Sequence, residues 1–439
     1  MLPIEPTEGT WWLPGDPAKR ISGAISYDDN DGAKLELQGV FVDALIDYPI
    51  ILGELKNGTP VTIFESITTS LQHGVKETVI SNTCVLGAHT GAFEDIVLSD
   101  YSVQLLHLDW WLRLSITNGH WGTPDPFANV FYKIDLDDLI IEVVRPFGDH
   151  FRKGPNSQQI PPAFLLNFVP SVPLNTEAMS RHIDIIKTFF EIVLGSSTRT
   201  SFVGGTLENG TQIDFLFSYG DRHQLDKTNV TPVDWMIEPH RLAPNLELKI
   251  KDWMRCYNTF DSSIHLLVAS RRPGQYVESN FSQITQALES YHRRTGQGQY
   301  MLPALHDAIV GTLVVAIPNS VPTDFRTSLL NRLKFSNERA FRWRIKDMIK
   351  KCKPMIGNLF DRLKLDEDIV TTNRNYYTHY EVEPEKSKQV AHGLALNRIS
   401  ESLTALLLCN FLLELSYTEN EVQQIINRCN SYKTIMDNN

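Results

Sequence analysis

The 439-residue chain lacks the short motifs that mark the most common nucleotide-binding and hydrolytic sites. It has no GxGxxG, no P-loop, no HExxH and no GxSxG, so no pattern points to a dinucleotide enzyme, an NTPase, a zinc protease or a serine hydrolase. The stretch RRTGQGQY (293–300) has two glycines but no Lys-Ser/Thr pair to bind a phosphate. We interpret it as a loop between two helices.

Cysteine is sparse and scattered along the chain. The cysteines are Cys84, Cys256, Cys352, Cys409 and Cys429. They form no CxxC pair and have no histidine at metal-ligand spacing, which favours buried free thiols in a reducing cytosol over a zinc site or a disulfide framework. We therefore expect neither a metal nor a cofactor.

A secretory signal and a membrane-spanning run are also not expected. The first residues, MLPIEPTEGTWWLPGD, have neither a basic region nor the apolar core of a signal peptide. The most apolar run, Leu403 to Leu415, is too short to cross a bilayer and contains Asn410 and Glu414. We expect that run to be a buried helix, and the protein to be cytoplasmic without a membrane partner.

Positive charge is in the minority. Lys and Arg number 41 against 52 Asp and Glu, which gives a net charge of −11 and a pI near 5.6. This balance argues against broad nonspecific binding to nucleic acid but allows a local basic site. A content of 42% hydrophobic and 21% charged residues is typical of a folded chain rather than a disordered one.

The first half of the sequence has the alternation of β structure. Residues 20–43, RISGAISYDDNDGAKLELQGVFVD, alternate on both sides of DDNDG, which predicts a hairpin. Asn209-Gly210 separates two alternating runs within 204–220 and predicts a second hairpin. Further strand-like segments cover 59–66, 101–116 and 138–147. The paired tryptophans in TWWLPGD and LDWWLRL could form a ligand surface, but packing is the more usual role of such residues.

The second half has helical spacing. One helix already interrupts the strands, where Asn175 or Thr176 can cap the start and Gly195 can end it. After about residue 245 the apolar period changes from two to 3.6 and stays there. The sequence therefore predicts a multidomain α+β protein, with a β-rich domain at 1–245 and an all-helical bundle at 246–439. The boundary is set to within about ten residues.

One stretch of the helical half, TTNRNYYTHYE (371–381), combines an arginine and a histidine. Arg374 and His379 fit the pattern of an arginine followed four to six residues later by a histidine, which chance alone produces about once or twice in such a chain. RLSITNGH (113–120) and RPFGDH (145–150) are similar. The first runs into a Gly-bearing turn and the second has a proline after its arginine, so only the stretch at 371–381 is expected to be helical.

Thr371, Thr372 or Asn373 could cap a new helix, which would place Arg374 and His379 in its first two turns. Five helical residues rotate by about 140°, so the two side chains would not share a face. They could converge on a ligand across the helix N-terminus, which favours a phosphate, or on a site completed by a second chain. The plain alternative is a solvated helix start with ordinary capping groups.

A predicted helix within 337–354, NERAFRWRIKDMIKKCKP, is strongly basic. Its cations are Arg339, Arg342, Arg344, Lys346, Lys350, Lys351 and Lys353. Phe341 and Trp343 are interleaved, so the helix could bind an RNA backbone beside stacking rings, or it could simply present a solvated face. The candidate RNA-binding residues are Arg342, Arg344, Lys346, Lys350, Tyr376 and Tyr380. For the tyrosines, packing is an equally good interpretation.

The helical half resembles the HEPN superfamily, whose signature is an arginine, usually followed by a polar residue, and a histidine four to six residues later. Arg374, Asn375 and His379 match that signature. The stretch RISESLTALLLCNFLLELSYTENEVQQII (398–426) resembles the closing helices of anti-phage HEPN proteins, and ESNFSQITQALESYHRR (278–294) resembles their opening helix. The N-terminal GTWWLPGDPAKRISGAISYDDNDGAKLELQG is similar to the start of ApeA-like anti-phage proteins, in which a β-rich domain precedes a HEPN domain.

The resemblance implies a conditional, metal-independent endoribonuclease of abortive infection, with Arg374, Asn375 and His379 as catalytic residues and tRNA or another structured RNA as substrate. It also implies a homodimer through the HEPN domain, and an N-terminal domain that senses a phage-derived trigger or restrains the nuclease. Histidine suits proton transfer and arginine suits a phosphorane-like charge. The alternative is a non-catalytic HEPN module that binds a nucleotide, RNA or protein while the β-rich domain binds a ligand.

Overall fold

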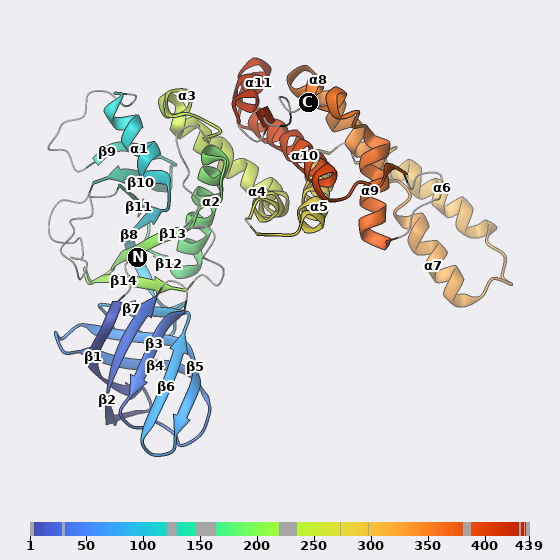
Figure 1. Cartoon of the computed structure of the whole chain (residues 1–439). Helices are drawn as coiled ribbons and strands as arrows, with labels where there is room; N and C mark the ends of the chain where they lie inside the picture. The colour runs from blue at the N-terminus through green and yellow to red at the C-terminus, as the bar shows by residue number, and fades with distance from the viewer. Residues whose placement is uncertain are drawn as a thin grey trace. The chain divides into compact units, whose positions relative to one another are not determined.

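The computed structural model divides the chain into two compact units, Met1–Lys251 and Asp252–Asn439. The residues described are 4–28, 31–119, 121, 130–145, 164–218, 235–272, 274–296, 298–380, 388–429, 432–433 and 435. The first unit is rich in strands and the second is helical (Figure 1), so the predicted α+β class is confirmed.

Six antiparallel strands of the first unit form a closed ring (Figure 1). They are β1 (Ile4–Leu13), β2 (Asp16–Asp28), β3 (Gly32–Leu37), β4 (Asp47–Leu55), β5 (Pro60–Gln72) and β6 (Lys76–Ser81). Their order is β4-β1-β2-β3-β6-β5, and pairing of β4 with β5 closes the ring. Closure leaves no free edge among these six strands, which removes a site for unwanted strand pairing.

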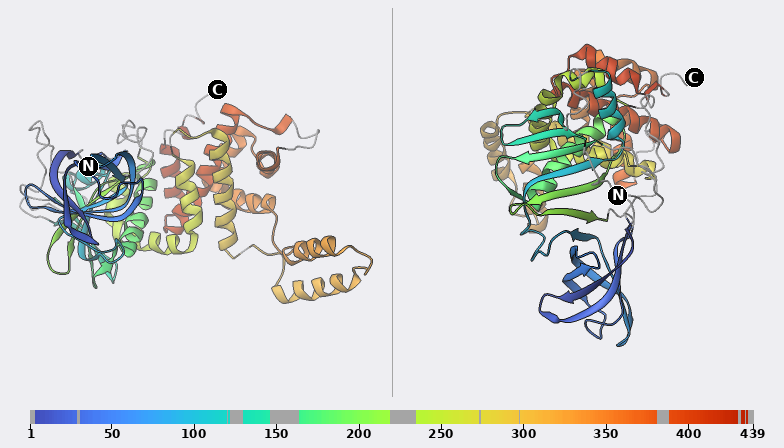
Figure 2. Two further views of the ribbon diagram at one scale, coloured as in Figure 1. Left: turned by 90° about the horizontal axis from the view of Figure 1, so that it is seen from below. Right: turned by 90° about the vertical axis from the view of Figure 1, so that its left-hand side faces the viewer.

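The remaining strands continue the sheet from β5. They are β7 (Thr83–Leu86), β8 (Val97–Leu105), β9 (Val130–Asp135), β10 (Leu139–Val144), β11 (Leu165–Pro170), β12 (Leu174–Asn175), β13 (Thr200–Leu207) and β14 (Gln212–Phe217). The order runs β5-β7-β14-β13-β8-β11-β10-β9, with β12 paired to β8. The right-hand view of Figure 2 shows this extended part of the sheet next to the ring. Both predicted hairpins, β2–β3 and β13–β14, are confirmed.

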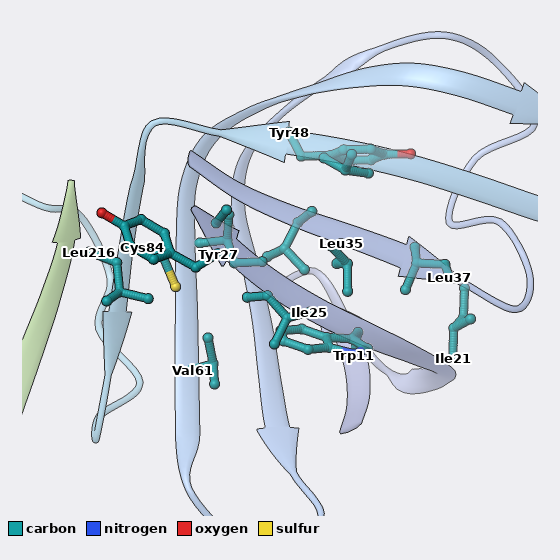
Figure 3. Close-up of a cluster of buried hydrophobic side chains, with 14 of the residues drawn as sticks. Trp11, Ile21, Ile25, Tyr27, Leu35, Leu37, Tyr48, Val61, Cys84 and Leu216 are labelled. Atoms are coloured by element: carbon teal, nitrogen blue, oxygen red, sulfur yellow. The ribbon is translucent and has the colours of Figure 1, made fainter. Parts of the chain in front are cut away.

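The ring encloses a tightly packed core (Figure 3). Trp11 is fully buried and lies with Ile25, Leu35 and Val61 in the ring interior. Its indole lies against the backbone of β4, because a Cβ at Gly53 would lie 2.1 Å from the ring. Trp12 and Trp111 are buried as well, so packing explains three of the four paired tryptophans, and only Trp110 is exposed.

A buried carboxylate closes one end of this core. Glu77 on β6 is fully buried, and its oxygens accept hydrogen bonds from the Phe41 amide (3.0 Å) and the Tyr48 hydroxyl (2.7 Å). The Thr68 hydroxyl lies 3.0 Å from Glu77 and 2.8 Å from the Ile46 carbonyl, and its one proton is shared between the two acceptors. Burial, together with this carboxylate, raises the pKa of Tyr48, so its hydroxyl remains a donor. Because each partner comes from a different segment, this one side chain joins the ends of β4 and β5 to the chain after β3.

The predicted strand at 101–116 is wrong in its second half. β8 ends at Leu105, His107 takes a left-handed conformation with φ 67°, and α1 (Leu108–Thr117) follows. Leu108, Trp111 and Leu112 are buried at helical spacing. The segment 101–116 is so rich in apolar residues that it also fits the alternation of a strand, which explains the wrong prediction. The helix predicted from 175 is confirmed as α2 (Thr176–Leu194), with Asn175 capping Ala178 and Gly195 in a left-handed conformation.

The two other matches to the Arg/His pattern, at 113–120 and 145–150, lie only partly within the described residues. Arg113 lies inside α1 rather than in a strand, and its guanidinium donates to Asp109 at 3.1 Å. His120 and residues 146–150 lie outside the described residues, so the turn predicted for RPFGDH stays a prediction. Two short elements, α3 (Pro239–Leu242) and a 3-10 turn η1 (Ala243–Asn245), lead to the helices of the second unit.

The second unit is a bundle of α-helices (Figure 1). They are α4 (Leu246–Ser270), which begins in the first unit, α5 (Val277–Arg294), α6 (Pro303–Ala316), α7 (Thr323–Lys334), α8 (Phe341–Leu363), α9 (Glu367–His379), α10 (Gly393–Glu414) and α11 (Glu419–Arg428). α10 packs on α5, α8 and α11, and α9 packs on α5 and α8. The run predicted as a buried helix lies in α10, where Leu403 and Leu412 are fully buried.

The helices α6 and α7 form a hairpin that extends away from the other helices of its unit (Figure 2, left). His306 is the one buried residue among the described residues of these two helices. Leu302, Leu305, Ile309 and Leu313 are 45–71% exposed. At spacings of three and four residues, these side chains form an apolar stripe along α6, and Val315, which is 86% exposed, adds apolar surface outside it.

All five cysteines are buried free thiols, and burial raises the pKa of those at 84, 256, 409 and 429. Among the described residues, no helix combines the length and apolar character needed to cross a membrane. No group of three or more His, Cys, Asp or Glu in the described ranges could hold a metal ion.

The buried carboxylate gives a stability prediction. Glu77→Ala leaves the Phe41 amide and the Tyr48 hydroxyl without their acceptor, which should cost about 2–4 kcal/mol. Native-state hydrogen exchange of the β3 and β6 amides measures this loss. The control is Glu36→Ala, because Glu36 pairs with Lys34 and Lys76 on the surface, where removal should cost less than about 1 kcal/mol. Equal losses for both variants would refute the role of Glu77.

Candidate functional site

The helix that carries the Arg/His pattern begins earlier than the sequence indicated. α9 starts at Glu367, and the Asp366 carboxylate caps it by accepting from the amides of Asp368 (3.0 Å) and Ile369 (2.9 Å). The expected start at Thr371 to Asn373 is therefore wrong. Because an acidic side chain occupies this N-terminus, and His379 is the last helical residue, a phosphate at the helix start is no longer the explanation of the pattern.

Arg374 lies in the middle of α9 and is partly engaged. Its guanidinium donates to the side-chain oxygen of Asn375 (3.3 Å) and to the Glu289 carboxylate on α5 (3.5 Å). It also lies 5.4 Å from the centre of the Phe341 ring on α8. Its side chain remains 33% exposed. These contacts fix the direction of the guanidinium while leaving part of it open to a ligand.

Arg374, Asn375 and His379 together span about 140° of the circumference of α9. At about 100° per residue, Asn375 lies about 100° and His379 about 140° from Arg374, and Asn375 and His379 are neighbours at i and i+4. Asn375 and His379 are exposed, and His379 makes no hydrogen bond or ion pair with any described residue. Arg374 is joined to Asn375 by the hydrogen bond to its side-chain oxygen. The three side chains therefore form a continuous polar arc.

A buried amide behind this arc joins α9 to the start of α10. Asn373 is fully buried and donates to the carbonyl oxygens of Ile369 (2.8 Å) and Gln389 (2.9 Å). Its own carbonyl accepts from the Ala391 amide at 2.7 Å. Sequence reasoning treated Asn373 as a possible cap and missed this role, because its partners come from a segment 16 to 18 residues later.

An aromatic cluster flanks the polar arc. Tyr376 lies edge-on to Tyr377 (5.0 Å between centroids), to Tyr380 (5.8 Å) and to His392 (5.8 Å). Tyr380 is 71% exposed, and Tyr377 packs against Phe281 of α5. Of the two tyrosines predicted to stack on bases, Tyr380 is therefore open and Tyr376 is half-buried.

His392 was not among the residues that the sequence singled out. It is exposed, it precedes α10, and its Nδ1 lies 2.9 Å from the Tyr377 hydroxyl. It falls 13 residues after His379, outside any spacing that the signature considers. No local pattern in the sequence marks it, because its neighbours come from α9.

The basic helix α8 is not one continuous cationic track. Arg344 is 1% exposed, with its Nε donating to the Arg339 carbonyl (2.9 Å) and its Nη1 3.5 Å from Nδ1 of His292. The candidate RNA contact at Arg344 is therefore corrected: this guanidinium lies in the core. Helical spacing explains the error, because Arg344 lies one residue from Ile345 and four from Met348, on the buried face.

The other candidate cations of α8 are exposed. Arg342 pairs with Asp368 (Nη2 to Oδ2, 2.8 Å), which raises the pKa of its guanidinium, and with Glu367 at 3.4 Å. Lys346 also lies 3.4 Å from Glu367. Lys350, like Lys351 and Lys353, is exposed and has no partner among the described residues. The cations free to bind a phosphate backbone are thus grouped after residue 346.

The two units differ in charge. Residues 1–251 contain 18 Lys and Arg against 32 Asp and Glu, for a net charge of −14, whereas residues 252–439 contain 23 against 20, for a net charge of +3. The overall charge of −11 therefore belongs to the strand-rich unit, and the helical unit can approach a polyanion without strong repulsion.

Comparison with known families agrees with this division. Residues 7–253 match the family model of the ApeA N-terminal domain 1, and residues 282–421 match the Apea-like HEPN model. The second match includes α9 and its polar arc. No curated protein and no solved structure matched the chain. Because the first match alone covers more than half of the sequence, the chain belongs to the ApeA-like family, in which an ApeA N-terminal domain precedes a HEPN domain.

Proposed function

We propose that this HEPN-domain defence protein is a conditional endoribonuclease that cleaves tRNA or another structured RNA during abortive infection. The observation that carries the proposal is the polar arc of Arg374, Asn375 and His379 on α9. A helix whose role is packing alone needs no exposed histidine on the same polar arc as a partly exposed arginine. The strand-rich unit would sense a phage-derived trigger or restrain the nuclease.

The residues of the arc suit metal-independent cleavage by the 2′-hydroxyl. In that reaction the 2′-oxygen attacks the adjacent phosphorus, the bond from phosphorus to the 5′-oxygen breaks, and the products are a 2′,3′-cyclic phosphate and a 5′-hydroxyl. Arg374 would neutralise the charge that develops on the non-bridging oxygens, since a guanidinium can donate to two of them. His379 would transfer a proton, and Asn375 would orient Arg374 or donate to a phosphate oxygen.

Other features of the helical unit that carries the arc support an RNA substrate. The helical unit carries the positive balance of the chain, and Lys350 on α8 is exposed and unpaired among the described residues. Arg342 and Lys346 extend this surface but are paired with carboxylates, which an RNA backbone would have to displace. Tyr380 presents an open ring on which an unpaired base could stack.

A non-catalytic module is the second candidate, and one contact favours it. Arg374 already has a carboxylate partner in Glu289, as expected of an arginine that stabilises the bundle. A purely structural or binding role, however, requires neither Asn375 nor the exposed His379. An assay that distinguishes cleavage of RNA from binding without cleavage separates the two functions.

We propose in addition that two copies associate through α6. The leucine-rich run at 403–415 is buried within its own unit, whereas α6 carries several exposed apolar side chains. Leu305 and Leu313 each lie four residues from Ile309, so an antiparallel pair of α6 helices would place Leu305 against Leu313 of the second copy. This self-complementarity favours a second copy of the chain as the occupant.

The area of the hairpin is sufficient for such a pair. Burying one Leu or Ile side chain removes roughly 60–120 Å² from water. With the exposed Tyr300, Met301 and Phe325 added to the stripe, two copies would bury roughly 1,200 Å² in total, the lower end of the range for specific interfaces.

The nuclease proposal predicts the effect of two substitutions. Arg374→Ala and His379→Ala should each lower the rate of tRNA cleavage in EDTA by about 100-fold or more, because each removes charge stabilisation or proton transfer. The measurement is the appearance of fragments on a denaturing gel under single-turnover conditions.

Matched controls are Arg255→Ala and His73→Ala, since both side chains are 79% exposed and lie on other elements. The controls should cleave at the wild-type rate, with circular dichroism unchanged for all four variants. If both α9 variants cleave normally, the site is wrong. If wild-type protein only retards the RNA on a native gel, the binding module is the better account.

The dimer proposal predicts a change of mass. Leu305→Glu combined with Ile309→Glu places two charges in the α6 stripe, and sedimentation velocity at about 10 µM should then show a monomer in place of a dimer, because burying unpaired charges is costly. Thr327→Glu, on the exposed surface of α7, is the control and should stay dimeric. A monomeric wild-type protein, or a double variant that remains dimeric, would refute this surface.

A further inference from the structure

The ring of His392 is held beside α9 by a hydrogen bond that selects its tautomer. The Tyr377 hydroxyl lies 2.8 Å from the carbonyl oxygen of Ala391 and 2.9 Å from Nδ1 of His392. A carbonyl oxygen can only accept, so both contacts are hydrogen bonds only when the single hydroxyl proton of Tyr377 goes to Ala391. Nδ1 of His392 must then carry the proton that it donates to the tyrosine oxygen. In the neutral ring this leaves Nε2 as the acceptor, on an exposed side chain.

The protonation of Tyr377 supports this assignment. Burial raises the pKa of its hydroxyl, and the nearby Glu278 on α5 raises it further, so the hydroxyl keeps its proton at neutral pH. Among the described residues, the titratable groups in contact with His392 are Tyr376 and Tyr377 from α9. Glu278 of α5 acts on Tyr377, the partner of the imidazole.

The backbone that carries His392 is fixed by the same buried amide that fixes α9. Asn373 holds the Gln389 carbonyl and the Ala391 amide, and Tyr377 holds the Ala391 carbonyl. Three hydrogen bonds therefore place the residues directly before His392. His379, by contrast, has no described partner that would select its tautomer.

Tyr376 relates His392 to His379, by a ring contact to the first and by helical spacing to the second. Tyr376 contacts the His392 ring edge-on, and on α9 it is the i−3 neighbour of His379. Side chains at i and i+3 lie about 5–6 Å apart at Cβ. One chain therefore brings two exposed imidazoles, of which one has a fixed acceptor nitrogen, to the last turn of α9.

We propose that His392 is a further catalytic residue, whose Nε2 accepts the proton of the attacking 2′-hydroxyl. This inference rests on the proposed ribonuclease function. It assigns the opposite task to His379, which donates a proton to the departing 5′-oxygen, while Arg374 neutralises the phosphoryl oxygens. Tyr377 is a positioning residue that holds His392 in the accepting tautomer.

The step balances within these groups. The 2′-oxygen forms a bond to phosphorus, its proton moves to Nε2 of His392, the bond from phosphorus to the 5′-oxygen breaks, and the proton of the His379 imidazolium ends on that oxygen. No oxidation and no co-reactant are involved. Proton exchange with water restores both histidines for the next turnover.

The test compares single-turnover cleavage of tRNA in EDTA by the full-length wild-type, His392→Ala, His392→Gln and Tyr377→Phe proteins, with His73→Ala as the exposed-histidine control. His392→Ala and His392→Gln should both lower the rate by about 100-fold or more without weakening RNA binding. Glutamine can still donate to Tyr377 but cannot accept the proton, so it separates chemistry from packing. Tyr377→Phe should lower the rate about 3- to 30-fold.

Two further readouts follow from proton acceptance. The acid limb of the pH–rate profile, where the rate rises as a base loses its proton, should disappear in His392→Ala. Added imidazole at millimolar concentration should restore part of the cleavage rate of His392→Ala. In the pH range of the acid limb, it should restore none of the rate of His379→Ala.

The outcomes separate this inference from the function on which it rests. If His379→Ala is inactive while His392→Ala cleaves with the wild-type rate and pH profile, His392 is not catalytic and the nuclease stands. If His392→Gln keeps the wild-type rate while His392→Ala loses it, the role of His392 is structural and the proposal is overturned. If the wild-type protein does not cleave RNA, the proposed function fails, and this inference fails with it.

Discussion

The geometry of the candidate site depends on the buried amide of Asn373. Its three hydrogen bonds tie one turn of α9 to itself and to the backbone at Gln389 and Ala391. A buried amide that loses its partners costs about 1–3 kcal/mol, so two segments distant in sequence are held in one arrangement. Arg374 is the residue directly after Asn373, and His392 is the residue directly after Ala391, to which Asn373 is hydrogen-bonded. The polar arc and the aromatic cluster therefore share one fixed base.

The side chains of α9 fall into two groups, those that contact α5 and those that face water. Tyr377 packs on Phe281 and Arg374 reaches Glu289, so this side holds the helix to α5. Asn375 and His379 face water, where a substrate could reach them. The acidic balance of the chain belongs to residues 1–251, so the helical unit does not repel a polyanion. The exposure of Asn375 and His379 and the charge of the helical unit both suit the polyanionic substrate proposed above.

Sequence patterns predicted what depends on near neighbours and missed what depends on tertiary partners. The hairpins at Asp28 to Gly32 and at Asn209-Gly210 were predicted from turn residues, and the buried α10 from its apolar run. The start of α9 was missed because two threonines and an asparagine looked like caps, whereas Asp366 caps the helix. Arg344 and His392 could not be placed, since burial and tautomer are set by residues that only the fold brings near.

The chemistry of the cut ends tests the central claim most directly. Fragments of tRNA produced by the full-length protein in EDTA can be analysed by mass spectrometry for the groups at their 3′ and 5′ ends. The arrangement of Arg374, Asn375 and His379 predicts 2′,3′-cyclic phosphates and 5′-hydroxyls, because the 2′-oxygen is the nucleophile. Fragments that end in 3′-hydroxyls and 5′-phosphates, which arise when water attacks instead, would contradict the account.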